Sequence, residues 1–64
     1  MTNAQYRILL RHLDLNAQEA GRVLGVSRRQ AQRYATRDAI PVPIAKLVRL
    51  MVEYRIDPEH VKAL

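Results

Sequence analysis

Helix-start signals recur three times in the first thirty residues of this chain, and their close spacing limits it to short helices. Each signal is a capping box, in which a polar residue is followed three positions later by Gln or Glu: Thr2 with Gln5, Asn16 with Glu19, and Ser27 with Gln30. In such a box the first side chain accepts a hydrogen bond from the amide of the last residue, whose own side chain reaches back to the cap. The sequence therefore predicts a succession of short helices, and no segment shows the alternation of a β-strand.

Apolar residues follow these boxes at helical spacing. The first helix is predicted to run to about Leu13, with one face formed by Tyr6, Leu9, Leu10 and Leu13. The second is predicted to end near Leu24, because Gly25 supplies the left-handed residue that stops a helix. The third follows within two residues of that stop and runs to about Thr36. Two helices joined this tightly form a helix-turn-helix.

The second half of the chain predicts two further helices. A loop over residues 37–42 leads to Pro43, which suits the first position of a helix because its missing amide is not needed there. The face of this fourth helix is formed by Ile44, Leu47, Val48, Met51 and Tyr54. Asp57 and Pro58 then cap a short last helix from Glu59 to about Ala63. Residues 1–64 are predicted to form one all-α domain of five helices.

The chain is basic, but it is too apolar for a disordered basic tail. It carries 11 Lys and Arg against 6 Asp and Glu, a formal charge of +5, with 48% hydrophobic residues. With no Cys and two His, we expect no metal and no cofactor. A domain this short is also a poor scaffold for a catalytic pocket, so we expect no enzyme. No apolar run approaches the roughly 20 residues of a membrane span, and we expect a cytoplasmic protein without membrane contact.

The excess positive charge is concentrated around the third helix. Residues 16–37 contain five Arg and the single acid Glu19, whereas residues 38–64 contain four bases and four acids. On the third helix, the residues opposite the apolar face are Arg28, Arg29, Gln32, Arg33 and Thr36. Duplex DNA carries dense phosphate charge, and its major groove admits a helix whose Arg and Gln side chains read guanine and adenine edges. This pattern favours a DNA-binding surface over a merely solvated basic face.

The segment from Asn16 to Tyr34, NAQEAGRVLGVSRRQAQRY, resembles the helix-turn-helix of the lambda-repressor/Cro (XRE) family of bacterial and phage regulators. That family has a small residue within the first motif helix, a Gly in the turn and apolar residues around both. These positions hold Gly21, Leu24, Gly25, Val26, Ala31 and Tyr34. The resemblance implies a compact lambda-repressor-like DNA-binding domain, with the motif over about residues 16–36.

The sequence departs from the family at three positions. Ala17 stands where Gln is common, which leaves open whether that phosphate contact is missing or taken over by Gln18. Ala31 is smaller than the usual residue, which predicts a space that Tyr34 fills. Thr36, Arg37 and Asp38 replace the common Gly after the third helix.

The third helix and the start of the second are the candidate DNA-binding residues. Base contacts are expected from Ser27, Arg28, Arg29, Gln32 and Arg33. Phosphate contacts are expected from the helix start at Asn16, Ala17 and Gln18, and from Arg22, Thr36 and Arg37.

Apolar residues near the end of the chain exceed what two short helices need for one small core: Val52, Tyr54, Ile56, Val61 and Leu64. They either close over the first helix or form a dimer interface over about residues 48–64, as the last helix often does in the family. We expect a homodimeric, Cro-like repressor of transcription that occupies a palindromic operator in double-stranded DNA and has no small-molecule effector. Two alternatives remain open. One is a protein-interaction module of the same fold, such as an antitoxin-like partner binder, and the other is a nucleic-acid-binding protein without sequence preference.

Overall fold

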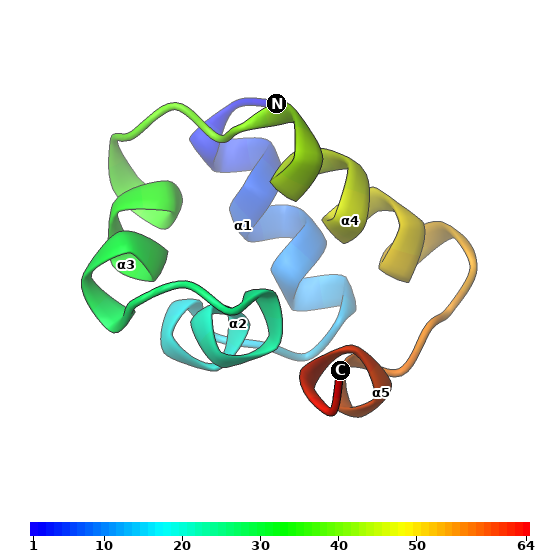
Figure 1. Ribbon diagram of the computed structural model, residues 1–64. Helices are drawn as coiled ribbons and strands as arrows, with labels where there is room; N and C mark the ends of the chain where they lie inside the picture. The colour runs from blue at the N-terminus through cyan, green and yellow to red at the C-terminus, as the bar shows by residue number, and fades with distance from the viewer.

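The computed structural model describes residues 1–64 and consists of helices joined by short loops (Figure 1). The five helices are α1 (Asn3–His12), α2 (Ala17–Leu24), α3 (Arg28–Thr36), α4 (Val42–Glu53) and α5 (Pro58–Lys62). α1 lies in the middle, with α3 packed on one side and α4 on the other, while α5 packs on α2 (Figure 1). The all-α prediction is confirmed. None of the five helices is both long enough and apolar enough to cross a membrane.

Two of the three capping boxes form as the sequence predicts. At Thr2 and at Asn16 the side-chain oxygen accepts from the backbone N–H of Gln5 (3.0 Å) and of Glu19 (2.8 Å), and both return bonds are present. The box at Ser27 is only half formed. Ser27 Oγ accepts from Gln30 N (3.1 Å), but the Gln30 side chain donates to Asp38 Oδ2 (3.2 Å) instead of to the cap. The prediction of a complete third box was therefore wrong: the bond to the Ser27 side chain forms, but the return bond from Gln30 does not.

The limits of α4 differ from those predicted. The helix begins at Val42, with Pro41 as its N-cap, so Pro43 is its second residue and not its first. It ends at Glu53, and Tyr54 is a C-cap residue that is 66% exposed and not part of the buried face. Ala45 is buried on that face together with Val48 and Met51.

The core is assembled from four helices, with Tyr6 at its centre. Eight buried side chains form one cluster: Tyr6, Leu10, Ala20, Val23, Tyr34, Ala35, Val48 and Met51. The rings of Tyr6 and Tyr34 meet edge to face, with centroids 6.3 Å apart and planes at 72°. α5 adds no buried residue and is joined to this core by the half-buried Val61. The core therefore fixes α3 mainly against α1 and α2.

α2 and α3 cross at two small residues, Gly21 and Ala31. A Cβ placed on Gly21 would lie 2.7 Å from the Cβ of Ala31, closer than two carbon atoms can approach. Ala31 is 0% exposed, and its Cβ faces Gly21. Its small size allows α3 to approach the backbone of α2. Gly25 serves a different need, because its φ of 76° is left-handed while its surroundings are open.

We predict that Gly21→Ala destabilises the fold, although Ala is favoured over Gly inside helices by about 1 kcal/mol. The clash with Ala31 forces the helices apart, and overpacking of this kind costs about 1–3 kcal/mol. Thermal unfolding should show a lower Tm, and Ala31→Gly in the same chain should restore part of it. The matched control is Gly25→Ala, whose cost is backbone strain, so Ala31→Gly should not restore it. If Ala31→Gly restored Tm equally in both glycine variants, or in neither, the close crossing of α2 and α3 would be refuted.

The hydroxyl of Tyr6 is a buried polar group without a hydrogen-bond partner. Burial, and secondarily the neighbouring Tyr34, raises the pKa of this hydroxyl from 10.0 to about 12. At neutral pH the hydroxyl is protonated in the folded and in the unfolded chain, so its ionisation does not affect stability there. Stability is lost as the pH rises from 10 toward 12, where the unfolded chain releases this proton and the folded chain retains it.

We predict that Tyr6→Phe raises Tm at neutral pH, because it removes a buried hydroxyl whose desolvation costs about 1–3 kcal/mol. Between pH 10 and 12 the variant should also lose less stability than the parent chain. Tyr54→Phe, at an exposed position, serves as the control and should change neither quantity when the proteins are measured at a concentration that keeps them monomeric. Denaturant unfolding at several pH values measures both effects. A clear loss of stability in Tyr6→Phe would show that the hydroxyl has a partner.

Candidate nucleic-acid interface

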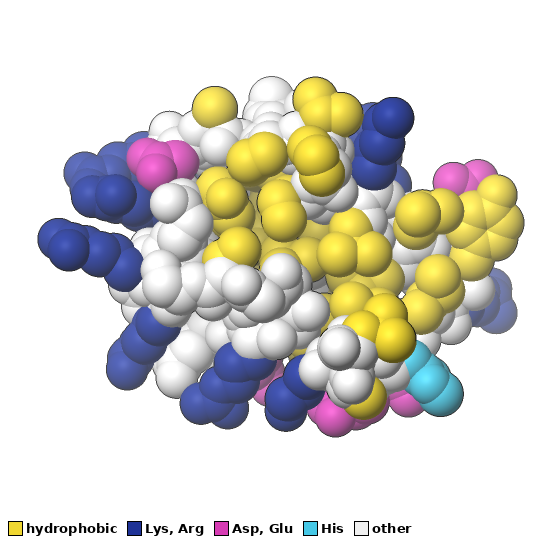
Figure 2. Space-filling view, in the orientation of Figure 1, with side chains coloured by type: hydrophobic (Ala, Val, Ile, Leu, Met, Phe, Trp, Pro, Cys, Tyr) yellow, Lys and Arg dark blue, Asp and Glu magenta, His cyan; other side chains and the backbone are white.

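One face of α3 is polar and cationic along its whole length. Arg28, Arg29, Gln32 and Thr36 are exposed, while Ala31, Tyr34 and Ala35 on the opposite face are buried. An open depression on this side has no hydrophobic residue in its lining, which consists of Arg29, Gln32, Arg33, Thr36 and Arg37. Lys and Arg side chains project from the edge of the molecule where α3 lies (Figure 2). The structure thus brings together most of the residues expected to contact bases.

Ser27 and Arg33 differ from the other expected base contacts. Ser27 caps α3 by accepting a hydrogen bond at Oγ, which leaves its hydroxyl hydrogen free to donate. Arg33 is half-buried, unlike Arg28 and Arg29 in the first turn. Its carbonyl accepts from the backbone N–H of both Arg37 and Asp38, at 2.9 Å each. The carbonyl of Arg33 thus accepts both backbone bonds that close the C-terminal end of α3.

The N-terminus of α2 forms a second cationic site that the sequence did not fully reveal. The N–H of Asn16 donates to Glu19 Oε1 (3.0 Å), so the free amides of this helix start are those of Ala17 and Gln18. Arg7 and Arg11 of α1 line the same depression as Asn16 and Ala17, together with Leu10, Leu15 and Ala35. Free helix amides beside two guanidinium groups are suited to an anion such as phosphate. Helical spacing places both Arg on α1, but only the tertiary packing brings them to α2.

Two of the expected phosphate contacts are placed less favourably. The Thr36 hydroxyl donates to the carbonyl of Gln32 (2.9 Å), so it must break this bond before it can donate to a phosphate. Arg22 is exposed, but it lines a depression on the other side of α2 with Glu19, Glu59 and Lys62. The structure does not bring Arg22 together with the α3 residues. Arg37 follows α3 as its C-cap and remains exposed beside the cationic face.

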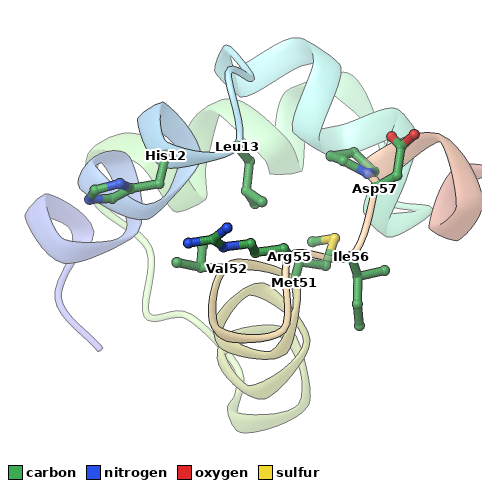
Figure 3. A pocket seen from close by; sticks show the side chains of 8 residues that line it. His12, Leu13, Met51, Val52, Arg55, Ile56 and Asp57 are labelled. Atoms are coloured by element: carbon green, nitrogen blue, oxygen red, sulfur yellow. The ribbon is translucent and has the colours of Figure 1, made fainter.

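The apolar residues predicted near the chain end have separate surroundings. Val61 is half-buried against the core, whereas Tyr54 and Leu64 are strongly exposed and Ile56 is 37% exposed. Val52 and Ile56 line a groove between the ends of α1 and α4 and the start of α5, which Figure 3 shows with Arg55 extending across it from the turn after α4. The other residues lining this groove are His12, Leu13, Met51, Asp57 and Pro58.

Exposed apolar residues that the sequence did not single out are Ile8, Val42 and Leu50. Leu50 precedes Tyr54 by four residues, so the two occupy one side of α4 and its cap. That spacing was a signal that could have identified Leu50. Hydrophobic side chains gather in the centre of the view in Figure 2 and continue toward α5. The structure therefore has a cationic edge at α3 and an apolar surface at α4 and α5.

Comparison with known proteins found no matching family model, no matching curated protein and no matching solved structure. The structure establishes an all-helical architecture of five helices. The lambda-repressor-like fold stays a prediction. No group of three or more His, Asp or Glu is arranged to hold a metal ion.

Proposed function

We propose that this protein binds duplex DNA with sequence specificity and regulates transcription by occupying an operator. The observation that carries this proposal is the exposed face of α3, where three Arg and one Gln stand together without an acidic or apolar neighbour in the same depression. In this proposal α3 enters the major groove, whose width accommodates one helix. The regulatory effect would be repression, because a bound protein blocks polymerase at a promoter.

The two parts of the proposed site, α3 and the start of α2, make different kinds of contact with DNA. The Arg side chains of α3 can each donate two hydrogen bonds to guanine O6 and N7, and Gln32 can pair with adenine N6 and N7. The free amide of Ala17, which shares a depression with Arg7 and Arg11, and the neighbouring amide of Gln18 suit a backbone phosphate next to the groove. Phosphate contacts fix the position of α3 on the duplex, and the α3 side chains supply the specificity.

A homodimer is part of this proposal, and its interface is the apolar surface at the ends of α4 and α5. Residues 38–64 are electrically neutral, with four bases and four acids, so two copies meet there without the repulsion that the cationic α3 edge would cause. Recognition helices one DNA turn apart are separated by about 34 Å. The longest dimension of one subunit is 27 Å, so the two α3 helices must lie away from the interface. The ends of α4 and α5 satisfy this condition, because α3 lies on the opposite side (Figure 1).

The proposal is tested by selecting the purified, folded protein against a random pool of duplex DNA at near-physiological salt. Enrichment of a two-fold symmetric site supports a dimeric regulator, and enrichment of a short asymmetric site supports DNA recognition but rejects the dimer. The absence of enrichment rejects sequence-specific binding. Weak binding with a steep salt dependence would then indicate a nucleic-acid-binding protein without sequence preference. Absence of DNA binding would indicate a protein-interaction module.

We predict that Arg29→Ala and Arg33→Ala each weaken binding to the selected site by about 1–3 kcal/mol, because each removes a base contact. Each variant should also lose discrimination at one base pair of the site. The matched control is Arg49→Ala on α4, which removes the same charge from the helix on the other side of α1 from α3 (Figure 1). It should leave base discrimination intact. Titration of labelled duplexes carrying single base-pair changes measures both quantities, and intact discrimination in both α3 variants would reject α3 as the reading helix.

We predict that Leu50→Glu and Tyr54→Glu shift the protein from dimer to monomer, because each buries a charge at the proposed interface. Ile8→Glu is the control, since Ile8 is 53% exposed and lies on α1, outside that surface. Sedimentation equilibrium of the three variants and the parent chain gives the dissociation constants. A parent chain that is monomeric at high concentration, or a dimer lost only in Ile8→Glu, would contradict this interface.

A further inference from the structure

The C-terminal end of α3 is bonded to side chains of α1. Asn3 Nδ2 donates to the carbonyls of both Tyr34 and Asp38, at 2.8 Å each. Arg7 Nη1 donates to the carbonyl of Ala35 at 2.5 Å. These bonds join the first helix to the end of the third across about half of the chain. Asn3 is half-buried and does not line the cationic depression of α3.

These bonds replace the glycine that the sequence lacks after α3. The last carbonyls of a helix have no partner within the helix and require donors from elsewhere. Here the C-cap Arg37 has a φ of −143°, so no left-handed residue closes the helix. Asn3 and Arg7 supply the missing donors. Because both donors belong to another helix, the way in which α3 ends depends on the position of α1.

Asp38 connects the same region to α3 itself. Its backbone N–H donates to the carbonyl of Arg33 (2.9 Å), and its carboxylate accepts from Gln30 Nε2 (3.2 Å). Its carbonyl accepts from Asn3, so three bonds converge on this one residue. The Gln30 side chain, which does not complete the Ser27 capping box, therefore bonds to a residue just beyond the C-terminal end of α3. The last turn of α3, which contains Arg33, is held by this set of bonds.

The two ends of α3 are thus fixed by different contacts. The first half is fixed by the Ser27 cap and by the close approach of Ala31 to Gly21. The second half is fixed by the bonds from Asn3 and Asp38. Loss of the bonds from Asn3 or to Asp38 would release the last turn of α3 but leave the first turn, with Arg28 and Arg29, in place.

We infer that Asn3 is a positioning residue for the last turn of the recognition helix, and that it determines specificity at the base pairs which Arg33 reads. This inference rests on the proposed DNA-binding function. Asn3 acts through the carbonyls of Tyr34 and Asp38, not by touching DNA. Arg7 makes a separate bond to the carbonyl of Ala35 in the same turn. It also lines the anion site at α2, so a variant of Arg7 would not test positioning alone.

The test compares Asn3→Ala with Thr2→Ala. Both shorten a polar side chain at the start of α1 without changing charge, but Thr2→Ala removes only the cap of α1 and keeps the bonds to α3. Circular dichroism and thermal unfolding first establish a temperature at which both variants are folded. Affinity is then measured for the selected duplex, for duplexes with single base-pair changes, and for unrelated duplex DNA.

Asn3→Ala is expected to weaken binding to the selected duplex by about 5- to 150-fold, the range for one lost base contact. Discrimination should disappear at the base pairs that Arg33→Ala affects and persist at those that Arg29→Ala affects. Binding to unrelated DNA should change much less than binding to the selected duplex, because the phosphate contacts at the start of α2 are unaltered. Thr2→Ala should retain the full pattern. An unchanged pattern in Asn3→Ala, or the same loss in Thr2→Ala, overturns the inference.

If Asn3→Ala does not fold, Gln30→Ala provides the second variant, because it removes the bond to Asp38 and should give the same pattern with a smaller loss. Equal discrimination in Gln30→Ala and the parent chain would then overturn the inference. The two proposals fail in different ways. A parent chain that selects no DNA site rejects both, whereas a parent chain that selects a site and an Asn3→Ala variant that reads it equally well reject only the positioning role.

Discussion

The close crossing of α2 and α3 at Gly21 and Ala31 is the constraint on which the rest of this structure depends. The two helices approach closely there, since a Cβ added to Gly21 would lie only 2.7 Å from the Cβ of Ala31. The turn between the two helices is only three residues long, residues 25–27. With this crossing in place, the free amides at the start of α2 and the exposed face of α3 have a fixed relation to each other. A site that combines phosphate and base contacts requires such a fixed relation.

α1 completes this arrangement from the other side. Its apolar face supplies Tyr6 and Leu10 to the core, while its polar residues Asn3 and Arg7 reach the end of α3. Arg7 and Arg11 also stand beside the start of α2. The first helix therefore contributes to the core, to the geometry of α3 and to the cationic surface. The single buried polar atom without a partner, the Tyr6 hydroxyl, is the cost of placing a large aromatic ring at this junction.

The features that the sequence predicted correctly are those set by residues close together in the chain. Two capping boxes, the left-handed Gly25 and the division of α3 into a buried and a charged face depend on neighbours within four positions. Tyr54 was wrongly assigned to the buried face of the fourth helix. The helix ends at Glu53, and Arg55 then has a φ of 53° without being a Gly, which no local signal marks. The half-formed box at Ser27, the pairing of Gly21 with Ala31 and the approach of Arg7 and Arg11 to α2 depend on residues brought together by packing. Sequence periodicity carries no information about these long-range partners.

The separation of the two faces of α3 has a consequence for how such a protein changes over time. Ala31, Tyr34 and Ala35, which hold the helix in the core, share no position with the exposed Arg and Gln residues. Exposed positions away from packing contacts tolerate substitution with little effect on stability. New side chains at the exposed positions can therefore be sampled without unfolding the domain. Under the proposed DNA-binding function, such a chain can diverge into relatives that read different DNA sites, while the same small interior is inherited unchanged.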